Sequence, residues 1–276
     1  MGRCQIPVLA VALLSAGSLS AQVDAVPTYR TSQLECSQFV ETSNTRISTQ
    51  TGRRSREQTA GRRGVWRFRA QPGKGDLALE GWLDTLVLWR RSPETTIRPD
   101  TDGLIGGRYR GILTPSGRYT GRVQPFIPDE VAEIAGMATA LDDFFPPLPP
   151  RILHIGEVWT DSSGLRIQRL ADSALSGLPL YRFSLQMKRE ANSAPIRQDT
   201  APLELHQVTL ERGRFVWHPT VGLWSRQRTI VVETTVPPGR AVPEPVRSHI
   251  EQRITVVRDL RVPVGRCAKP ADAQTG

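Results

Sequence analysis

Residues 141–159 read LDDFFPPLPPRILHIGEVW, and they divide the chain into two parts. Four prolines, at 146, 147, 149 and 150, stand between a helical pattern and a return to strands. Because proline lacks the backbone N–H and crowds the preceding turn, a helix cannot continue through this stretch. Proline-rich segments are stiff and extended. The stretch therefore predicts a junction between two sets of strands, and the helix and the proline-rich stretch together span residues 128–150.

The residues before the prolines have the period of an amphipathic helix. In PDEVAEIAGMATAL (128–141) apolar residues recur at spacings of three and four, so they share one helical face. A proline at the start and two acids after it suit the first turn of a helix. We predict one helix that ends near Leu141, with Phe144 and Phe145 packing its end against a sheet.

Both parts of the chain alternate polar and apolar residues, which is the period of a β-strand. In the first part, about 34–124, the pattern is clearest at 65–70, 76–89 and 108–123. In the second part, about 151–262, it recurs at 157–172, 178–187, 202–219, 223–236 and 246–262. Proline and glycine at 72–75 and 115–117 break it as tight turns do, and short connections join antiparallel neighbours. The sequence predicts a mainly β protein with a single β-rich domain over residues 22–267.

The two ends of the sequence have compositions of their own. Residues 1–21 show the pattern of a secretory signal peptide: one basic residue, an apolar stretch, and small residues before the cut. That apolar stretch is shorter than the roughly 20 residues that a membrane-spanning helix needs. We predict an exported protein, periplasmic or secreted, with no transmembrane segment in the mature chain. Small polar residues at 268–276 predict a disordered tail.

Two cysteines, Cys36 and Cys267, remain after removal of the signal peptide, and they lie near the two ends of the mature chain. Export brings a protein into an oxidising compartment, where cysteines pair. We predict a disulfide between them. The alternative is two unpaired thiols.

The charge is strongly basic, with a net value of +9, and all but three of the 36 lysine and arginine residues are arginine. The guanidinium fork matches carboxylate and phosphate groups, although codon usage in a GC-rich genome gives the same bias. Five arginines near the start of the segment 53–69 are candidates for contact with an anionic surface: Arg53, Arg54, Arg56, Arg62 and Arg63. The alternative is a half-buried strand in which Trp66 and Phe68 point inward and the arginines are solvated. Nucleic acid is not an expected partner of an exported protein.

The sequence shows no catalytic or metal-binding constellation. Its four histidines, at 154, 206, 218 and 249, are scattered, with no pair at metal-ligand spacing. Residues 99–103, PDTDG, resemble the opening of a calcium loop, but the later acidic ligands are missing, and a hydrogen-bonded turn is the alternative. We expect no metal and no cofactor.

Two stretches resemble a group of uncharacterised bacterial exported domains. They are FFPPLPPRILHIGEVW (144–159) and GRFVWHPTVGLWSRQRTIVVETTV (213–236), a glycine-led hairpin with a long final strand. These domains are similar, distantly, to the lipoprotein-carrier fold of the bacterial envelope. The resemblance implies a large curved antiparallel sheet, an open half-barrel, that can shelter an apolar group. It implies no catalytic residue.

From these observations we expect a non-enzymatic envelope protein that binds an apolar ligand or lipid, or a protein partner, in a concave sheet. The residues expected to line the concavity are Trp82, Leu86, Leu88, Phe144 and Phe145. One alternative is a hydrolase whose site assembles from separated residues such as Asp100, Asp142 and His154. Another is a binder of anionic surfaces through the five arginines named above.

Overall fold

The structure is a computed structural model that describes residues 26–175, 178–198, 201–238 and 243–261. The predicted signal peptide, the predicted tail and Cys267 lie outside the described residues. Cys36 is buried. Because Cys267 is outside the described residues, the disulfide between the two cysteines stays a prediction.

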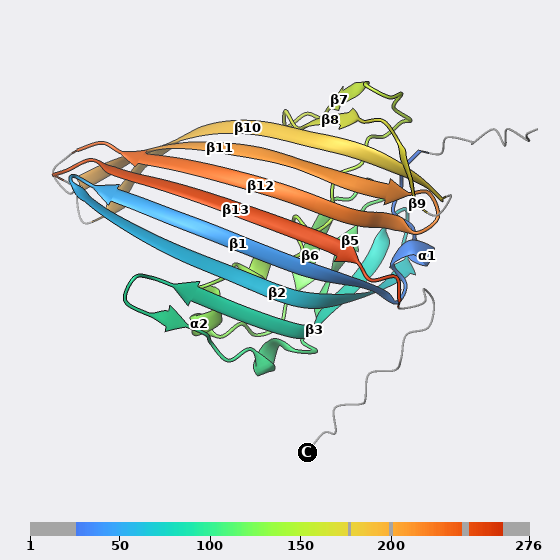
Figure 1. The fold of residues 1–276 in the computed structure, drawn as a ribbon, viewed down its shortest axis with the longest axis horizontal. Helices are drawn as coiled ribbons and strands as arrows, with labels where there is room; N and C mark the ends of the chain where they lie inside the picture. The colour runs from blue at the N-terminus through green and yellow to red at the C-terminus, as the bar shows by residue number, and fades with distance from the viewer. Residues whose placement is uncertain (1–25, 176–177, 199–200, 239–242, 262–276) are drawn as a thin grey trace, which may run out of the picture.

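Thirteen strands form one open antiparallel sheet, as the alternating sequence predicts (Figure 1). The first half of the sheet comprises β1 (Ser37–Thr51), β2 (Arg54–Pro72), β3 (Leu77–Arg91), β4 (Thr96–Ile97), β5 (Tyr109–Leu113) and β6 (Tyr119–Val123). The second half comprises β7 (Val158–Thr160), β8 (Arg166–Arg169), β9 (Ser173–Leu175), β10 (Leu178–Gln198), β11 (Ala201–His218), β12 (Gly222–Val236) and β13 (Val246–Arg258). Hairpins form at both predicted turns, between β2 and β3 and between β5 and β6.

The first and last of the described strands, β1 and β13, lie side by side in the middle of this sheet. The order across it is β6-β5-β3-β2-β1-β13-β12-β11-β10-β8-β7, with β4 beside β3 and β9 beside β10. The β1–β13 register runs without a shift from Phe39 opposite Arg258 to Thr51 opposite Val246. The two sets of strands predicted from the sequence are thus two halves of one sheet. The halves are joined at the centre of the sheet, where β1 pairs with β13.

Residues 124–157, here called the crossing segment, connect β6 at one edge of the sheet to β7 at the other. The segment runs over one face of the sheet, called the inner face, and its apolar side chains are buried there. Those side chains are Val131, Met137, Leu141, Phe144, Phe145 and Leu148. The opposite face is called the outer face. The proline-rich junction predicted from the sequence is therefore also the cover of the core.

The predicted helix over 128–141 is wrong in extent. The described residues hold only short helical turns: α1 (Thr31–Leu34), η1 (Asp102–Leu104), α2 (Asp129–Ala132) and η2 (Met137–Thr139). Gly136 takes a non-helical conformation between α2 and η2, and the Met137 N–H bonds the carbonyl of Ala135 instead of continuing the helical ladder. Glycine costs about 1 kcal/mol in a helix interior, and packing of the apolar side chains on the sheet takes precedence over helix formation.

The sheet is open, as expected, but it is not strongly curled, so the expectation of a strongly curved half-barrel is wrong. A sheet that wraps a long helix must bend around it. Here the cover is an irregular chain one layer thick, with aromatic rings filling the space. Phe144 lies 5.7 Å from Phe39, 6.0 Å from Trp66 and 5.1 Å from Phe68, measured between ring centroids.

The long strands continue well beyond the crossing segment, toward the left of Figure 1. In β1 the last buried position is Ser43. In β13 the buried positions are Val256 and Arg258, at the end of the strand that pairs with the start of β1. This extension is called the wing. It comprises residues 44–59, 188–198, 201–210, 229–238 and 243–253. The sheet is therefore covered at one end and a single layer at the other.

Replacing Phe144 with alanine is expected to lower the free energy of unfolding by about 3–5 kcal/mol, because it opens a cavity among the rings that join the cover to the sheet. Phe126 belongs to the same crossing segment but is 84% exposed, so Phe126→Ala is the matched control, expected to stay within about 0.5 kcal/mol. Urea denaturation followed by tryptophan fluorescence measures both. Equal effects of the two variants would contradict this account of the core.

Stability at alkaline pH is expected to depend on Tyr109 of β5. Burial raises the pKa of Tyr109 to about 12, above the value of about 10 in an unfolded chain. The neutral phenol therefore favours folding below pH 10, and this contribution is lost as the pH rises from 10 to 12.

The Tyr109 hydroxyl has no hydrogen-bond partner in the described part of the chain, so Tyr109→Phe is expected to be nearly neutral at pH 8. Between pH 8 and pH 11 the variant is expected to lose less stability than the wild type, measured by urea denaturation at both values. An identical loss in the two proteins would show that Tyr109 does not carry the effect.

Candidate functional site

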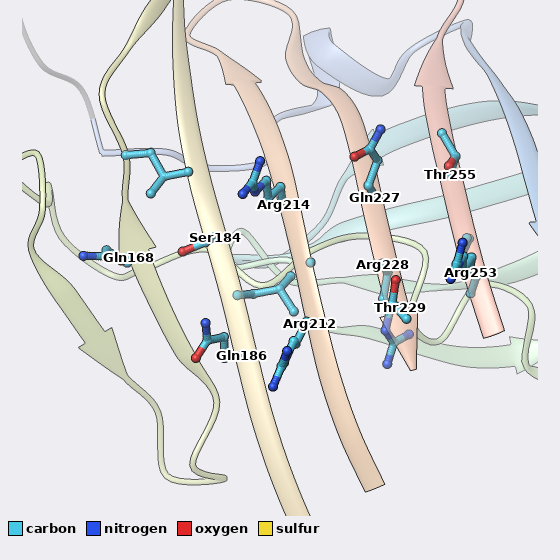
Figure 2. Close-up of a pocket in the computed structure, with 14 residues that line it drawn as sticks. Gln168, Ser184, Gln186, Arg212, Arg214, Gln227, Arg228, Thr229, Arg253 and Thr255 are labelled. Atoms are coloured by element: carbon cyan, nitrogen blue, oxygen red, sulfur yellow. The ribbon is translucent and has the colours of Figure 1, made fainter. Parts of the chain in front are cut away.

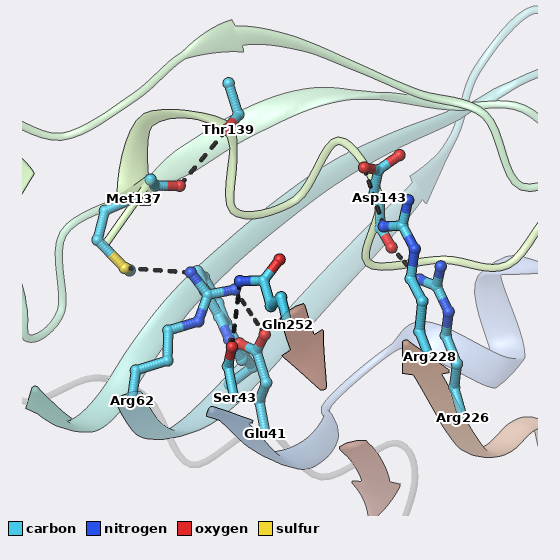
Figure 3. Close-up of polar contacts among 11 residues, drawn as sticks. Glu41, Ser43, Arg62, Met137, Thr139, Asp143, Arg226, Arg228 and Gln252 are labelled. Carbon is cyan, nitrogen blue, oxygen red and sulfur yellow. Dashed lines mark hydrogen bonds and ion pairs between the residues drawn. The ribbon is translucent and has the colours of Figure 1, made fainter. Parts of the chain in front are cut away.

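A buried ion pair anchors the crossing segment to the first half of the sheet (Figure 3). Glu41 of β1 accepts hydrogen bonds from the guanidinium of Arg62 at 2.6 Å and from the indole N–H of Trp66 at 2.8 Å. A second nitrogen of Arg62 lies 3.6 Å from the sulfur of Met137 in the crossing segment. The pair neutralises two charges that are both buried. Arg62 is thus part of the interior, and it is not free to contact a surface.

A second buried cluster anchors the same segment to the other half of the sheet. Arg228 of β12 pairs with Glu211 of β11 at 2.6 Å and with Asp143 of the crossing segment at 3.0 Å. Its neighbour Arg226 donates a hydrogen bond to the backbone carbonyl of Asp143. Burial, aided by the nearby charge of Arg228, lowers the pKa of Arg226 to about 10. Both guanidinium groups therefore stay charged at neutral pH, and the two acids of the cluster, Glu211 and Asp143, balance their two charges.

This cluster decides the role of the paired acids Asp142 and Asp143. Asp143 is committed to Arg228, whereas burial and the neighbouring Asp143 raise the pKa of Asp142. Arg151, the nearest basic residue after them in the sequence, lies 2.6 Å from Glu157. Asp143 therefore anchors the crossing segment, whereas Asp142 is exposed and has no ion pair in the described part of the chain.

The five apolar candidates do not line one common space. Leu86 and Leu88 of β3 are buried in the core with Phe144 and Phe145. Trp82 lies on the outer face of β3, where the guanidinium of Arg108 stacks 4.0 Å from its ring. The four core residues contact one another and the sheet, as ordinary packing requires, and their predicted role in ligand binding stays a prediction.

The five arginine candidates also separate, contrary to the expectation of one anionic-surface site. Arg62 is buried on the inner face, and Arg63 next to it is exposed on the outer face. Arg54 and Arg56 share the face of Arg62 but lie on the wing, and Arg53 is in the turn before β2. Strand alternation causes this separation, because successive side chains point to opposite faces. Trp66 and Phe68 do point inward, as the alternative interpretation of this segment predicts.

The residues of the hydrolase hypothesis lie apart in the structure. Asp100 stands between β4 and η1, beside β3, and its carboxylate accepts the Asp102 N–H at 2.9 Å as in a hydrogen-bonded turn. His154 is exposed just before β7, at the other edge of the sheet, and Asp142 lies between them in the crossing segment. Within the described ranges, no group of three or more histidines, cysteines or acids is placed to hold a metal ion.

A hollow of about 260 Å³ opens on the inner face where the crossing segment ends its cover. Its walls come from β1, β2 and β13 and from the turn that contains Ile134. The residues that line it are Ser43, Thr45, Ile47, Ala60, Gly61, Arg62, Ile134, Ala135, Gly136, Ile250 and Gln252. Since Arg62 is already paired, the hollow offers mainly small and apolar surface.

A larger, shallow groove of about 560 Å³, here called the outer groove, lies on the outer face (Figure 2). It spans β8, β10, β11, β12 and β13. The residues drawn in Figure 2 with polar side chains are Gln168, Ser184, Gln186, Arg212, Arg214, Gln227, Arg228, Thr229, Arg253 and Thr255. Arg212 and Arg214 are both exposed. The side chain of Arg228 belongs to the buried cluster on the inner face.

Sequence reasoning missed Arg212 and Arg214 as candidates. The signal for their orientation was present, since Phe215 points inward and strand alternation then sends the two arginines outward. Their uncharged surroundings come from β10 and β12, however, and the residues that stand opposite each arginine depend on the register of these strands, which alternation alone does not fix.

The fold defines a class of protein, one built on a single open antiparallel sheet whose cover is an irregular chain segment. The sequence matches no protein-family model, and it matches no curated protein. Among solved structures it has a weak similarity to a DUF1329 family protein from Desulfovibrio piger, with 9% identity and a TM-score of 0.17 over 83% of this chain and 88% of that chain. Among the described residues, no helix is long and apolar enough to cross a bilayer.

Breaking the Glu41–Arg62 pair is expected to destabilise the protein strongly. Glu41→Ala leaves a buried guanidinium without its acid, a change that costs about 3–5 kcal/mol in other proteins. The control is Glu57→Ala, which breaks the exposed pair with Arg46 and is expected to leave the unfolding midpoint unchanged within error. Urea denaturation at pH 7 compares the two variants. A midpoint for Glu41→Ala close to that of the control would refute the anchoring role.

Proposed function

We propose that this protein is a non-enzymatic, exported binding protein that holds the apolar part of a ligand, such as an acyl chain, on the uncovered inner face of the wing. The observation that carries the proposal is a row of apolar side chains that continues the core beyond its cover. Ile47 of β1 stands opposite Ile250 of β13, which stands opposite Val232 of β12. All three face the same side as the buried core and are only half-buried.

The hollow beside Ile134 supports the proposal, because it joins this row to the covered core. Ile47 and Ile250 form part of its wall. Its volume, about 260 Å³, is slightly below the range of about 300–1,000 Å³ for small-molecule sites. An acyl chain would place its end in the hollow and lie along the row, gaining about 0.8 kcal/mol for each CH₂ group removed from water.

The resemblance to the envelope lipoprotein-carrier fold agrees with this proposal in one respect only. In both, an apolar group is sheltered against a sheet. The site proposed here lies beyond the crossing segment, because Phe144 and Phe145 fill the space between that segment and the sheet. The ligand therefore adds to the cover and does not replace it.

Binding is tested with 1-N-phenylnaphthylamine, an uncharged probe that becomes fluorescent in apolar surroundings. The mature protein is expected to bind the probe, and Ile250→Lys is expected to weaken binding at least tenfold because it places a charge in the row. Val231 of β12 is half-buried on the outer face, so Val231→Lys is the matched control, with expected affinity close to that of the wild type.

Native mass spectrometry of protein purified from the exported fraction identifies the natural ligand. A co-purifying amphiphile that is lost in Ile250→Lys but kept in Val231→Lys would support the proposal. Two results would refute it: absence of the protein from the exported fraction, or equal probe binding by the two variants. A protein in place of the amphiphile, bound through the same row, would point to a docking face instead.

A further inference from the structure

Arg212 and Arg214 form a pair of uncompensated positive charges in the outer groove. They are two residues apart on β11, so they share the outer face at a spacing of roughly 7 Å. Neither has an ion pair with any residue that the structure describes, in contrast to Arg62 and Arg228 of the interior. Like charges on neighbouring positions repel each other, and an anion bound between the two guanidinium groups would remove that repulsion.

The strands on both sides of this pair supply uncharged polar groups. Gln186 and Thr229 stand opposite Arg212 on β10 and β12. Ser184 and Gln227 stand opposite Arg214 in the same way. Each arginine is thus placed between a carboxamide on one side and a hydroxyl on the other, and Figure 2 shows these side chains along the groove.

Beyond β12 the polar surface continues onto β13. Thr255 stands opposite Gln227, and Arg253 stands opposite Thr229. Arg253 is 2.6 Å from the carboxylate of Glu251, so its charge is balanced in part. The groove therefore concentrates its free positive charge on β11, with hydrogen-bonding groups on both sides, at strand intervals of about 4.8 Å.

This arrangement selects among anionic ligands. A guanidinium group binds a carboxylate through two parallel hydrogen bonds. Carboxamide and hydroxyl side chains both donate and accept, which is what the hydroxyl groups of a sugar require. The residues that line the groove include no aromatic side chain, whereas sites for single-stranded nucleic acid stack bases on aromatic rings.

We propose that the outer groove binds an acidic polysaccharide, with carboxylates of its uronic acid units on Arg212 and Arg214 and its hydroxyl groups on the flanking carboxamides and hydroxyls. The volume of about 560 Å³ is within the range for small-molecule sites and accommodates a short run of sugar units. The site is on the face opposite the apolar row, so it does not depend on the function proposed above.

The test uses oligogalacturonate, an oligosaccharide of uronic acid units, and isothermal titration calorimetry of the mature protein. Binding is expected, and its affinity is expected to fall steeply as the salt concentration rises, since the charges are exposed. A neutral maltooligosaccharide of the same length is expected not to bind. The double variant Arg212→Gln/Arg214→Gln is expected to lose at least tenfold in affinity.

A matched control removes the same charge elsewhere on the surface. Arg118 and Arg122 are both exposed, next to and within β6 at the far edge of the sheet. The variant Arg118→Gln/Arg122→Gln is expected to bind oligogalacturonate like the wild type. Circular dichroism and the urea midpoint show whether each variant is folded.

Recognition of the sugar, apart from its charge, is tested with Gln186→Ala/Gln227→Ala. This variant keeps both arginines and is expected to lose affinity for oligogalacturonate severalfold while its binding of inorganic sulfate stays the same. Equal losses in the two arginine double variants would overturn the proposal, because they would show a general effect of net charge. Binding to phosphatidylglycerol vesicles without binding to oligogalacturonate would also overturn it, in favour of a lipid surface.

Discussion

The packing of Phe144 and Phe145 against the inner face is the interaction on which the rest of the structure depends. A single open sheet with an apolar face needs a second layer, and this chain supplies that layer with the crossing segment, to which Tyr29, Leu34 and Leu104 add. Phe144 touches rings from β1 and β2, and Phe145 touches Tyr29 and Phe68. Where the segment ends, the second layer ends too, which leaves the wing with its apolar row. The position of the proposed acyl site is therefore set by the length of the cover.

Much of this fold follows from local patterns, and the rest depends on contacts between distant segments. The alternation of polar and apolar residues identifies the strands, the turns between them and the inward side chains Trp66 and Phe68. Each of these properties depends only on residues that are close in the sequence. The helix over 128–141 was predicted on the same local grounds, and it fails because Gly136 and contacts with the sheet decide the backbone there. Strand order was beyond prediction. Arg212 was predictable as an outward residue, while its place among carboxamides and hydroxyls was not, because that depends on the register of β11 with β10 and β12.

Arginine serves two distinct purposes in the protein. Arg62, Arg226 and Arg228 lie inside the fold and join the crossing segment to both halves of the sheet through acids, a carbonyl group and a sulfur atom. Lysine would not replace them, since a guanidinium group offers several donors in a fixed plane and is less costly to remove from water. Arg212 and Arg214 have the opposite character, being exposed and without acidic partners in the part of the chain that the structure describes. The high arginine content therefore reflects structural need as well as surface charge.

The pairing of β1 with β13 makes assembly conditional on a complete chain. Of the strands that the structure describes, β1 is synthesised first, and its partner on one side, β13, is synthesised last. A chain that stops before residue 246 leaves β1 and β12 with open edges in the middle of the sheet, and open edges recruit other chains. The backbone hydrogen bonds that join the two halves of the sheet are those between β1 and β13, so a fragment that contains every residue of one half leaves one of these two strands without its partner.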